Sequence, residues 1–216
     1  MKNLNLTQIV ISFISIAICF YYYFTDSNTI DFLLAEDSIF ENLTSICLFL
    51  TAVVLIFYFF KFKSRKSTTW KVCILILAAG LIFGAGEEIS WGQRIFGIES
   101  SDFFKQNNAQ QETNLHNMVV GGTKINKIIF SIAFSIIFGI YFLFGGLIYN
   151  NLPKLKSLIN MFGIPIPTYT QSLIFLISTG VIMLMNHSRK WELWEFIFAF
   201  TILIVFYKPL NRKEIY

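Results

Sequence analysis

Charged residues are scarce in this sequence. Asp, Glu, Lys and Arg together make up 14% of its 216 residues, whereas a soluble domain carries about 25%. In their place, 55% of the residues are hydrophobic and 18% are aromatic. Such a composition excludes a water-soluble enzyme and a disordered chain, and it predicts a protein that lies in a membrane.

Cysteine is also rare. Cys19, Cys47 and Cys73 each lie within or at the edge of an apolar stretch, at different expected depths. Thiols placed in this way predict neither a disulfide framework nor a cysteine-based zinc site. We expect them to be buried as small apolar residues.

Six apolar stretches occur along the chain. A helix needs about 20 residues to cross the hydrocarbon core of a bilayer, so the third, fifth and sixth stretches must be extended by flanking residues. We expect an all-α, polytopic membrane protein with about six transmembrane helices in one domain over residues 1–216. The stretches are Leu6–Phe24, Leu43–Phe60, Val72–Gly86, Ile128–Tyr149, Leu173–Met185 and Leu193–Tyr207.

The basic residues indicate the orientation. Eleven of the 17 Lys and Arg residues lie in the N-terminal tail, the 61–71 loop, the 150–170 loop and the C-terminal tail, and six lie in the other connections. Because basic residues favour the cytoplasmic side, we expect both termini in the cytoplasm. This placement explains the net charge of +4 without a nucleic-acid partner. Membrane lipid is the partner that the composition predicts, and the oligomeric state stays open.

Acidic residues show the opposite distribution. Twelve of the 13 Asp and Glu residues lie on the predicted outer side, and only Glu214 lies inside. Insertion into the membrane does not require this bias, because Asp and Glu contribute little to topology. A function at the outer side would explain it.

Paired glutamates follow the third stretch. Glu87 and Glu88 lie about 22 Å of helix rise beyond Val72, just inside the outer boundary of the hydrocarbon, where carboxylates usually face the bundle and serve a function. Continued as a helix, the segment would place Glu87, Trp91 and Arg94 on one face. Arg94 could neutralise Glu87 as a structural clamp, but two carboxylates exceed what one arginine requires, so we favour a functional site.

The outer connection between the third and fourth helices is long, at about forty residues, and long loops are often functional. If residues 107–117 are helical, Asn108, Glu112 and His116 form a stripe that can bind one ion or pass one proton. Asn114 and Asn117 add the amides that metal-bound side chains need as hydrogen-bonding partners. We expect this segment to fold back over the helix ends and bring Glu112 and His116 to the paired glutamates. The alternative is a polar amphipathic helix on the membrane surface.

Two further acidic pairs are expected at the same depth. Asp37 and Glu41 precede the second span, Glu192 and Glu195 enter the sixth, and His187 ends the fifth. Each pair alone fits a helix start that is favoured by the helix dipole. Together they predict a shared site, because clustered carboxylates in a low-dielectric pocket must be neutralised by cations or shared protons.

Two fragments carry a resemblance to a known family. Residues 86–94 (GEEISWGQR) and 111–117 (QETNLHN), with the acidic segment 36–41 (EDSIFE), resemble a widespread family of bacterial multi-span membrane proteins. The resemblance implies a location in the bacterial cytoplasmic membrane. It supplies no activity.

The paired glutamates also resemble the first motif of the CAAX-protease and bacteriocin-processing family of intramembrane metal-dependent peptidases. In that motif an arginine follows the pair, and here Arg94 follows it two residues late. The resemblance implies that Glu87 or Glu88 activates a water molecule, and that His116 and His187 bind or orient it.

These observations lead to two functional hypotheses and a structural alternative. The first is a metal-dependent hydrolase that acts on a lipid-linked or peptide substrate, with Zn²⁺, Fe²⁺ or Mn²⁺ as the ion that fits a site of His and carboxylates. The second is a non-enzymatic transporter or sensor that binds a cation or protons at the same acids. A structural membrane protein is the third. The expected catalytic residues are Glu87 and Glu88, the expected metal ligands are Glu112, His116, His187 and Glu195, and the supporting residues are Asp37, Glu41, Trp91, Arg94, Asn108, Asn114, Asn117 and Glu192.

Overall fold

The structure is a computed structural model, and it describes residues 2–115, 117–120, 123–124 and 134–216. These residues form helices and one small hairpin, in which the two-residue strands β1 and β2 pair in antiparallel orientation. The helical fold class is as expected from the composition. The elements are α1 (Lys2–Thr25), α2 (Ser27–Leu33), α3 (Ile39–Phe62), α4 (Thr68–Glu88), α5 (Gln93–Phe96), α6 (Asp102–Asn107), β1 (Val119–Val120), β2 (Thr123–Lys124), α7 (Phe134–Asn151), α8 (Pro153–Phe162), α9 (Tyr169–Met183), α10 (Lys190–Tyr207) and α11 (Arg212–Ile215).

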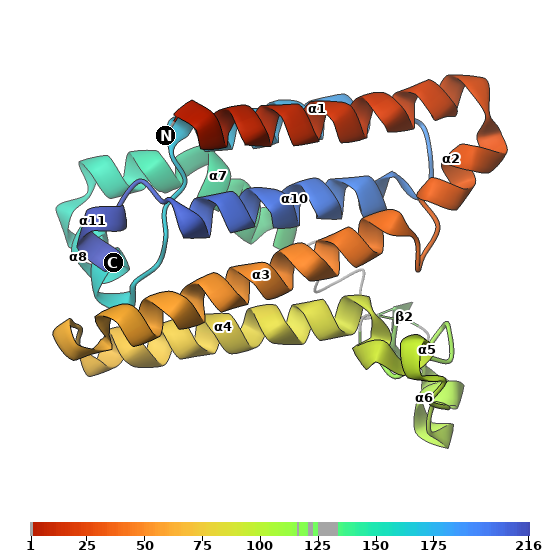
Figure 1. The fold of residues 1–216 in the computed structure, drawn as a ribbon, viewed down its shortest axis with the longest axis horizontal. Coiled ribbons are helices and arrows are strands. Elements are labelled where there is room, and N and C mark those ends of the chain that lie inside the picture. Colours follow the sequence, from red (N-terminus) through yellow and green to blue (C-terminus); the bar gives the residue numbers. More distant parts are fainter. Residues whose placement is uncertain (1, 116, 121–122, 125–133) are drawn as a thin grey trace.

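The long helices lie side by side in an elongated bundle (Figure 1). Helix α3 lies at its centre and packs along both α4 and α10, while α1 packs against α9 and α10. One end of the bundle carries both chain termini, α8 and α11, and the opposite end carries α2, α5 and α6 (Figure 1). We call the first the basic end, after Lys61, Lys63, Arg65, Lys66, Lys154, Lys156, Lys208, Arg212 and Lys213, and the second the acidic end, after Glu36, Asp37, Glu41, Glu87, Glu88, Glu192 and Glu195.

The predicted apolar stretches coincide with helices over the residues that the structure describes. Flanking residues extend the short third, fifth and sixth stretches, which become α4, α9 and α10. Three helices, α1, α3 and α4, are long and apolar enough to cross a membrane, and a fourth span results if α7 and α8, bent by 113° at residue 152, count as one. Helix α9 is apolar but shorter. The structure therefore supports a helical membrane protein.

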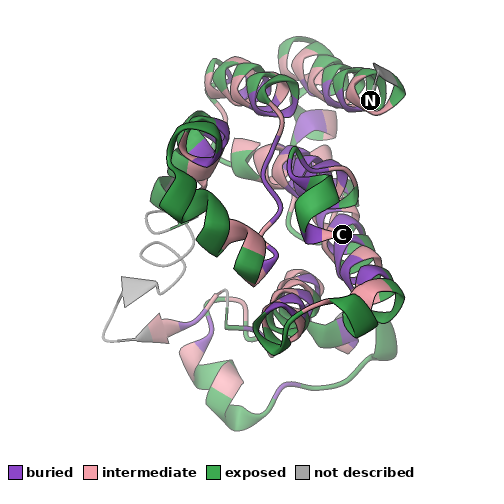
Figure 2. Ribbon diagram, turned by 90° about the vertical axis from the view of Figure 1, so that its left-hand side faces the viewer, coloured by how far each residue is buried: buried purple, intermediate pink, exposed green. Residues whose placement is uncertain are grey.

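The core lies between the helices, and large apolar side chains also cover the outside. Leu55 of α3, Ile74 of α4 and Ile197 of α10 are fully buried. Figure 2, which looks along the bundle, shows buried residues mainly on the sides of helices that face one another. On the outward sides, Phe13 and Phe60 are 70% and 63% exposed. A surface of this kind is favourable against lipid and unfavourable against water.

Candidate functional site

Helix α4 ends at a left-handed turn. The helix stops at Glu88, and Ser90, Trp91 and Gly92 follow with φ angles of 46°, 54° and 74°. Three successive residues in the left-handed region cannot continue a right-handed helix. The expected helical face of Glu87, Trp91 and Arg94 is therefore wrong. Ser90 and Trp91 bear backbone strain that glycine would avoid, and such strain often accompanies functional sites.

The left-handed turn folds Trp91 back onto the helix. Its indole Nε1 donates to Glu87 Oε1 at 2.8 Å. Gly86 makes room for the ring, because a Cβ atom at this position would lie 2.8 Å from Trp91. Trp91 thus serves as a hydrogen-bonding partner of a buried carboxylate.

Glu87 joins the long connection to α4. Its second carboxylate oxygen, Oε2, accepts the backbone N–H of Leu115 at 2.5 Å. The side chain is buried, with 5% of the residue exposed, as expected for a carboxylate that faces the bundle. This bond confirms that the connection folds back over the end of α4. Both carboxylate oxygens of Glu87 accept N–H donors, so this side chain holds Trp91 and the connection in position. Its catalytic role stays a prediction.

A second carboxylate, Glu112, lies at the same turn. Its Oε2 accepts the Ser90 hydroxyl at 2.6 Å and the Asn114 amide at 3.2 Å. The Asn114 amide also donates to Ser90 Oγ at 2.8 Å. The strained Ser90 is therefore held on both sides by the connection. The structure brings Glu112 and Asn114 to the turn after α4, as the sequence predicted.

Amides organise the rest of the connection. Asn108 Nδ2 donates to the backbone and side-chain oxygens of Asn114, both at 2.9 Å, while Asn108 Oδ1 accepts the N–H of Gln110 and of Glu112. Asn117 donates its backbone N–H to Asn114 Oδ1 at 3.0 Å. Asn108 and Asn114 are buried. These side chains stabilise the loop from within. The predicted role of the amides beside a bound metal ion stays a prediction.

The expected helix over 107–117 is wrong. Helix α6 ends at Asn107, and the chain then turns, with Asn108 and Met118 forming an isolated bridge between the two ends of the loop. The reason is local: Asn side chains bind neighbouring backbone groups and so compete with a helix. His116 lies outside the described residues, so its expected approach to Glu87 stays a prediction.

Sequence reasoning missed a second anchor of this loop. Gln93 accepts the N–H of Thr113 at 2.7 Å and donates to Ser100 Oγ at 2.7 Å, and the Thr113 hydroxyl donates to Ser100 at 3.2 Å. Two segments of the connection are thereby tied together. Single polar residues with no periodic pattern gave no signal of this contact.

The other acids of this end meet on three helices. Among the described residues, the charges that act on Glu88 of α4 are all carboxylates, chiefly Glu195 of α10, Glu41 of α3 and Glu192 of α10. Glu195 and Glu41 likewise repel each other, and Glu41 also lies within range of Glu112. The five carboxylates are half-buried: Glu41, Glu88, Glu112, Glu192 and Glu195. The structure therefore confirms the expected convergence of carboxylates from separate helices.

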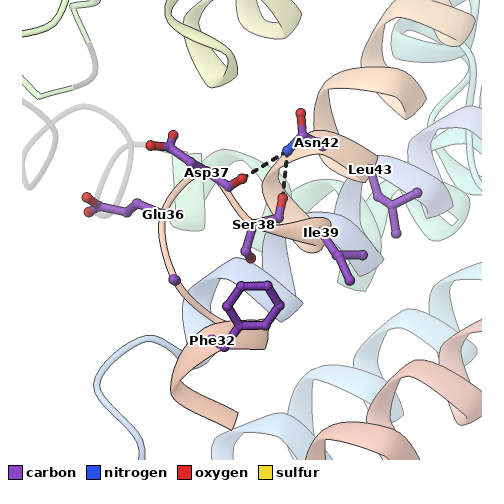
Figure 3. Close-up of a pocket in the computed structure, with 8 residues that line it drawn as sticks. Phe32, Glu36, Asp37, Ser38, Ile39, Asn42 and Leu43 are labelled. Carbon is purple, nitrogen blue, oxygen red and sulfur yellow. Dashed lines mark hydrogen bonds between the residues drawn. The ribbon is translucent and has the colours of Figure 1, made fainter. Parts of the chain in front are cut away.

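The start of α3 holds one of these acids in place. Asp37, which has a φ of 72°, donates its backbone N–H to a Glu41 carboxylate oxygen. Asn42 donates to the backbone oxygens of Asp37 and Ser38, at 3.2 and 2.8 Å (Figure 3). These contacts fix the turn that leads into α3. The Asp37 backbone takes part in both contacts, and the role of its carboxylate in a shared acidic site stays a prediction.

Two cavities open beside the acids. One, of about 230 Å³, is lined by Asp37, Glu41, Asn42, Glu88, Ile89 and Ile95. A wider one, of about 580 Å³, shares Asp37 and Asn42 with it. Figure 3 shows the carboxylates of Glu36 and Asp37 on one side of the wider cavity and Phe32, Ile39 and Leu43 on the other. Glu41 and Glu88 line the smaller cavity, and the wider cavity beside it has an acidic, partly apolar lining.

His187 is placed differently from what we expected. Its Nε2 lies 3.1 Å from Asp31 Oδ1 on α2, and its Nδ1 accepts the backbone N–H of Arg189 at 3.2 Å. Both ring nitrogens are therefore used within the protein, and the neutral tautomer with a proton on Nε2 satisfies both bonds. In this arrangement His187 joins α2 to the start of α10. Its assignment as a metal ligand stays a prediction.

No group of three or more His, Cys, Asp or Glu side chains within the described ranges has the arrangement of a metal site. The acidic end brings Glu88, Glu192 and Glu195 within range of one another, but their carboxylates do not form such an arrangement. Comparisons of the chain with protein-family models, with curated proteins and with solved structures found no match.

Proposed function

We propose that this chain is a multi-pass protein of the bacterial cytoplasmic membrane, with six spans and its acidic end on the outer side. Six helices of at least 15 residues, α1, α3, α4, α7, α9 and α10, support this number. The grouping of basic connections at the opposite end supports the orientation, because lysine and arginine favour the cytoplasm.

We propose further that the acidic end binds a divalent cation between Glu88 and Glu195, with Glu41 beside them. The observation that carries this proposal is the convergence of half-buried carboxylates from α3, α4 and α10, among which the charges that act on Glu88 and Glu195 within the described residues are all carboxylates. Like charges in a low-dielectric site repel strongly. For this site to form, the carboxylate oxygens of the three helices must turn toward one ion. Of the ions that the sequence favours, Mn²⁺ fits best to a site built from carboxylates.

Hydrolysis of a lipid-linked or peptide substrate is the reaction that this arrangement supports best. A divalent cation supplies Lewis-acid activation of water at neutral pH. Glu41, at the edge of the cavity next to Glu88, can accept the proton of the attacking water. The wider cavity, with apolar Phe32 and Leu43 opposite acidic Glu36, suits a substrate that has an apolar part at the membrane boundary.

Binding of Mn²⁺ to the purified protein tests the proposal. We expect Mn²⁺ to raise the thermal unfolding temperature of the wild type in a saturable way, because a ligand of the folded state stabilises it. Glu88→Gln should remove this effect. Glu99→Gln is the matched control, since Glu99 is exposed on the same end and pairs with Lys105 at 3.1 Å. An equal response in all three proteins would contradict the site.

A second candidate function follows from one specific observation. No described group of three acidic, His or Cys side chains has a metal-site arrangement, and shared protons would neutralise Glu88 and Glu195 without such an arrangement. In this alternative the protein is a proton- or cation-binding transporter or sensor. A wild type whose stability responds to pH but not to Mn²⁺, with the pH response lost in Glu195→Gln, would favour it.

A further inference from the structure

Helix α8 differs in direction from the helix before it. It follows α7 after a bend of 113°, so it runs nearly perpendicular to that helix at the basic end. Pro153 stands in its first turn, where proline is tolerated. If α7 crosses the bilayer, α8 lies close to the plane of the membrane surface.

Three large apolar residues of α8 project away from the protein. Leu155, Leu158 and Met161 follow one another at intervals of three and are 41%, 44% and 42% exposed. Ile159 and Phe162, four positions after Leu155 and Leu158, lie on the same side of the helix and are half-buried. The apolar side of α8 is therefore only partly covered by the protein, and Leu155, Leu158 and Met161 form its exposed part.

The orientation of α8 is fixed at its C-terminal end. Gly163 closes the helix with a φ of 68°, and a Cβ atom there would lie 2.6 Å from the indole of Trp70, which is 1% exposed. The chain then continues in an extended, buried segment, in which Asn211 accepts the N–H of Ile166 and donates to the oxygen of Ile164, both at 3.0 Å. Because this anchor is well packed, the apolar residues of α8 cannot simply rotate into the core.

Positive charge surrounds these residues. Lys154 and Lys156 lie on α8 itself, and both are exposed. The α3–α4 connection and the C-terminal segment add further lysines and arginines at this end, where Glu214 is the single acidic residue in the described part of the chain. Some of these groups are engaged already, since Lys66 donates to the backbone oxygen of Glu214 at 2.7 Å. Lys156 Nζ lies 5.1 Å from the centre of the Tyr149 ring, and neither ammonium group of α8 has a hydrogen bond or ion pair among the described residues.

We propose that α8 docks on the anionic leaflet of the surrounding bilayer. Leu155, Leu158 and Met161 enter the boundary between headgroups and acyl chains, and Lys154 and Lys156 bind lipid phosphates. A short amphipathic helix with lysines on its polar side is the kind of element that lies in a membrane interface. Each lysine near an anionic surface adds about 1 kcal/mol. The protein thereby selects anionic lipid at its basic end, independently of any chemistry at the acidic end.

Two measurements on the full chain test this inference. The first measures the depth of α8, with a fluorescent label on Leu158→Cys in a background in which Cys19, Cys47 and Cys73 are replaced by serine. In vesicles of phosphatidylcholine and phosphatidylglycerol, a quencher on the lipid acyl chain should reduce the emission and aqueous iodide should not. Ser157→Cys, on the polar side, is the matched control and should respond to iodide.

The second measures the enrichment of phosphatidylglycerol over phosphatidylcholine around the protein in the same mixture. Changing both Lys154 and Lys156 to Gln should lower the enrichment by roughly five-fold for each lysine, the equivalent of about 1 kcal/mol. Lys105→Gln, at the opposite end, should leave it unchanged.

Three results would overturn the inference. Quenching of the label at position 158 by iodide would place α8 in water. Protection from both quenchers that depends on protein density would show that a second copy of the chain covers α8. An unchanged lipid enrichment in the Lys154→Gln/Lys156→Gln protein would show that α8 does not select anionic lipid.

Discussion

The Glu87 carboxylate accepts the backbone N–H of Leu115 at 2.5 Å, although the two residues are 28 positions apart in the sequence. This bond fastens the outer connection to the end of α4. It places Glu112 and the amide-rich loop beside the acids of α3 and α10. The geometry of the whole acidic end depends on it.

Replacing Glu87 with Gln should loosen the loop without unfolding the bundle. A hydrogen bond to a charged group contributes about 1.5–3 kcal/mol, so exchange of the Leu115 amide hydrogen should accelerate by roughly ten- to a hundredfold. Hydrogen–deuterium exchange measures this rate. Glu99→Gln is the control, and equal exchange rates in the two variants would contradict the anchoring role of Glu87.

Replacing Asn114 with Ala should destabilise the connection more than replacing Asn107. Asn114 is 3% exposed, and its side chain bonds to Ser90, Glu112, Asn108 and Asn117. Its loss leaves buried partners unsatisfied, at about 1–3 kcal/mol for each. The Asn107 amide bonds only to the Phe103 oxygen, at 2.9 Å. Limited proteolysis between residues 108 and 118 should detect the difference, and equal cleavage of both variants would refute it.

Replacing Gly163 with Ala should lower the thermal stability in detergent. The new Cβ atom would lie 2.6 Å from Trp70, and the residue has a φ of 68°. Overpacking costs about 1–3 kcal/mol, and the left-handed backbone adds about 1–2 kcal/mol. Gly97→Ala isolates the second effect, because Gly97 has a φ of 63° but no atom within 4 Å of the added Cβ. If both variants melt alike, the contact with Trp70 is not tight.

Labelling of single cysteines tests the orientation. Gln106 on α6 and Lys63 in the α3–α4 connection are both exposed and lie at opposite ends of the bundle. In a background without Cys19, Cys47 and Cys73, a membrane-impermeant reagent should modify Gln106→Cys in intact cells and leave Lys63→Cys unmodified. The reverse pattern would place the acidic end in the cytoplasm.

Much of this fold follows from hydrophobic pattern alone. The stretches that became α1, α3 and α4 are long and nearly free of charge, so their extent and type could be predicted from the sequence. The convergence of Glu41, Glu88 and Glu195 could be predicted as well, because helices of similar length that cross one layer bring their ends to one depth.

The details of the acidic end could not be predicted in the same way. The turn after Glu88 depends on positive φ angles at Ser90 and Trp91, and neither residue type favours such a conformation locally. The long-range bonds of Glu112 and Asn114 to Ser90, together with the bond from Trp91 to Glu87, stabilise it. The pairing of His187 with Asp31 depends on where α2 lies, which no periodicity encodes.

Binding of Mn²⁺ to a double-mutant cycle tests the central claim most directly. The four proteins are the wild type, Glu88→Gln, Glu195→Gln and the double variant, and the electron paramagnetic resonance signal of free Mn²⁺ reports the amount bound. If Glu88 and Glu195 hold one ion, the wild type binds a single ion saturably, each single variant loses at least roughly ten-fold in affinity, and the double variant loses less than the sum of the two. Equal binding by all four proteins, or no binding by the wild type, would contradict a shared cation site at the end of this bundle.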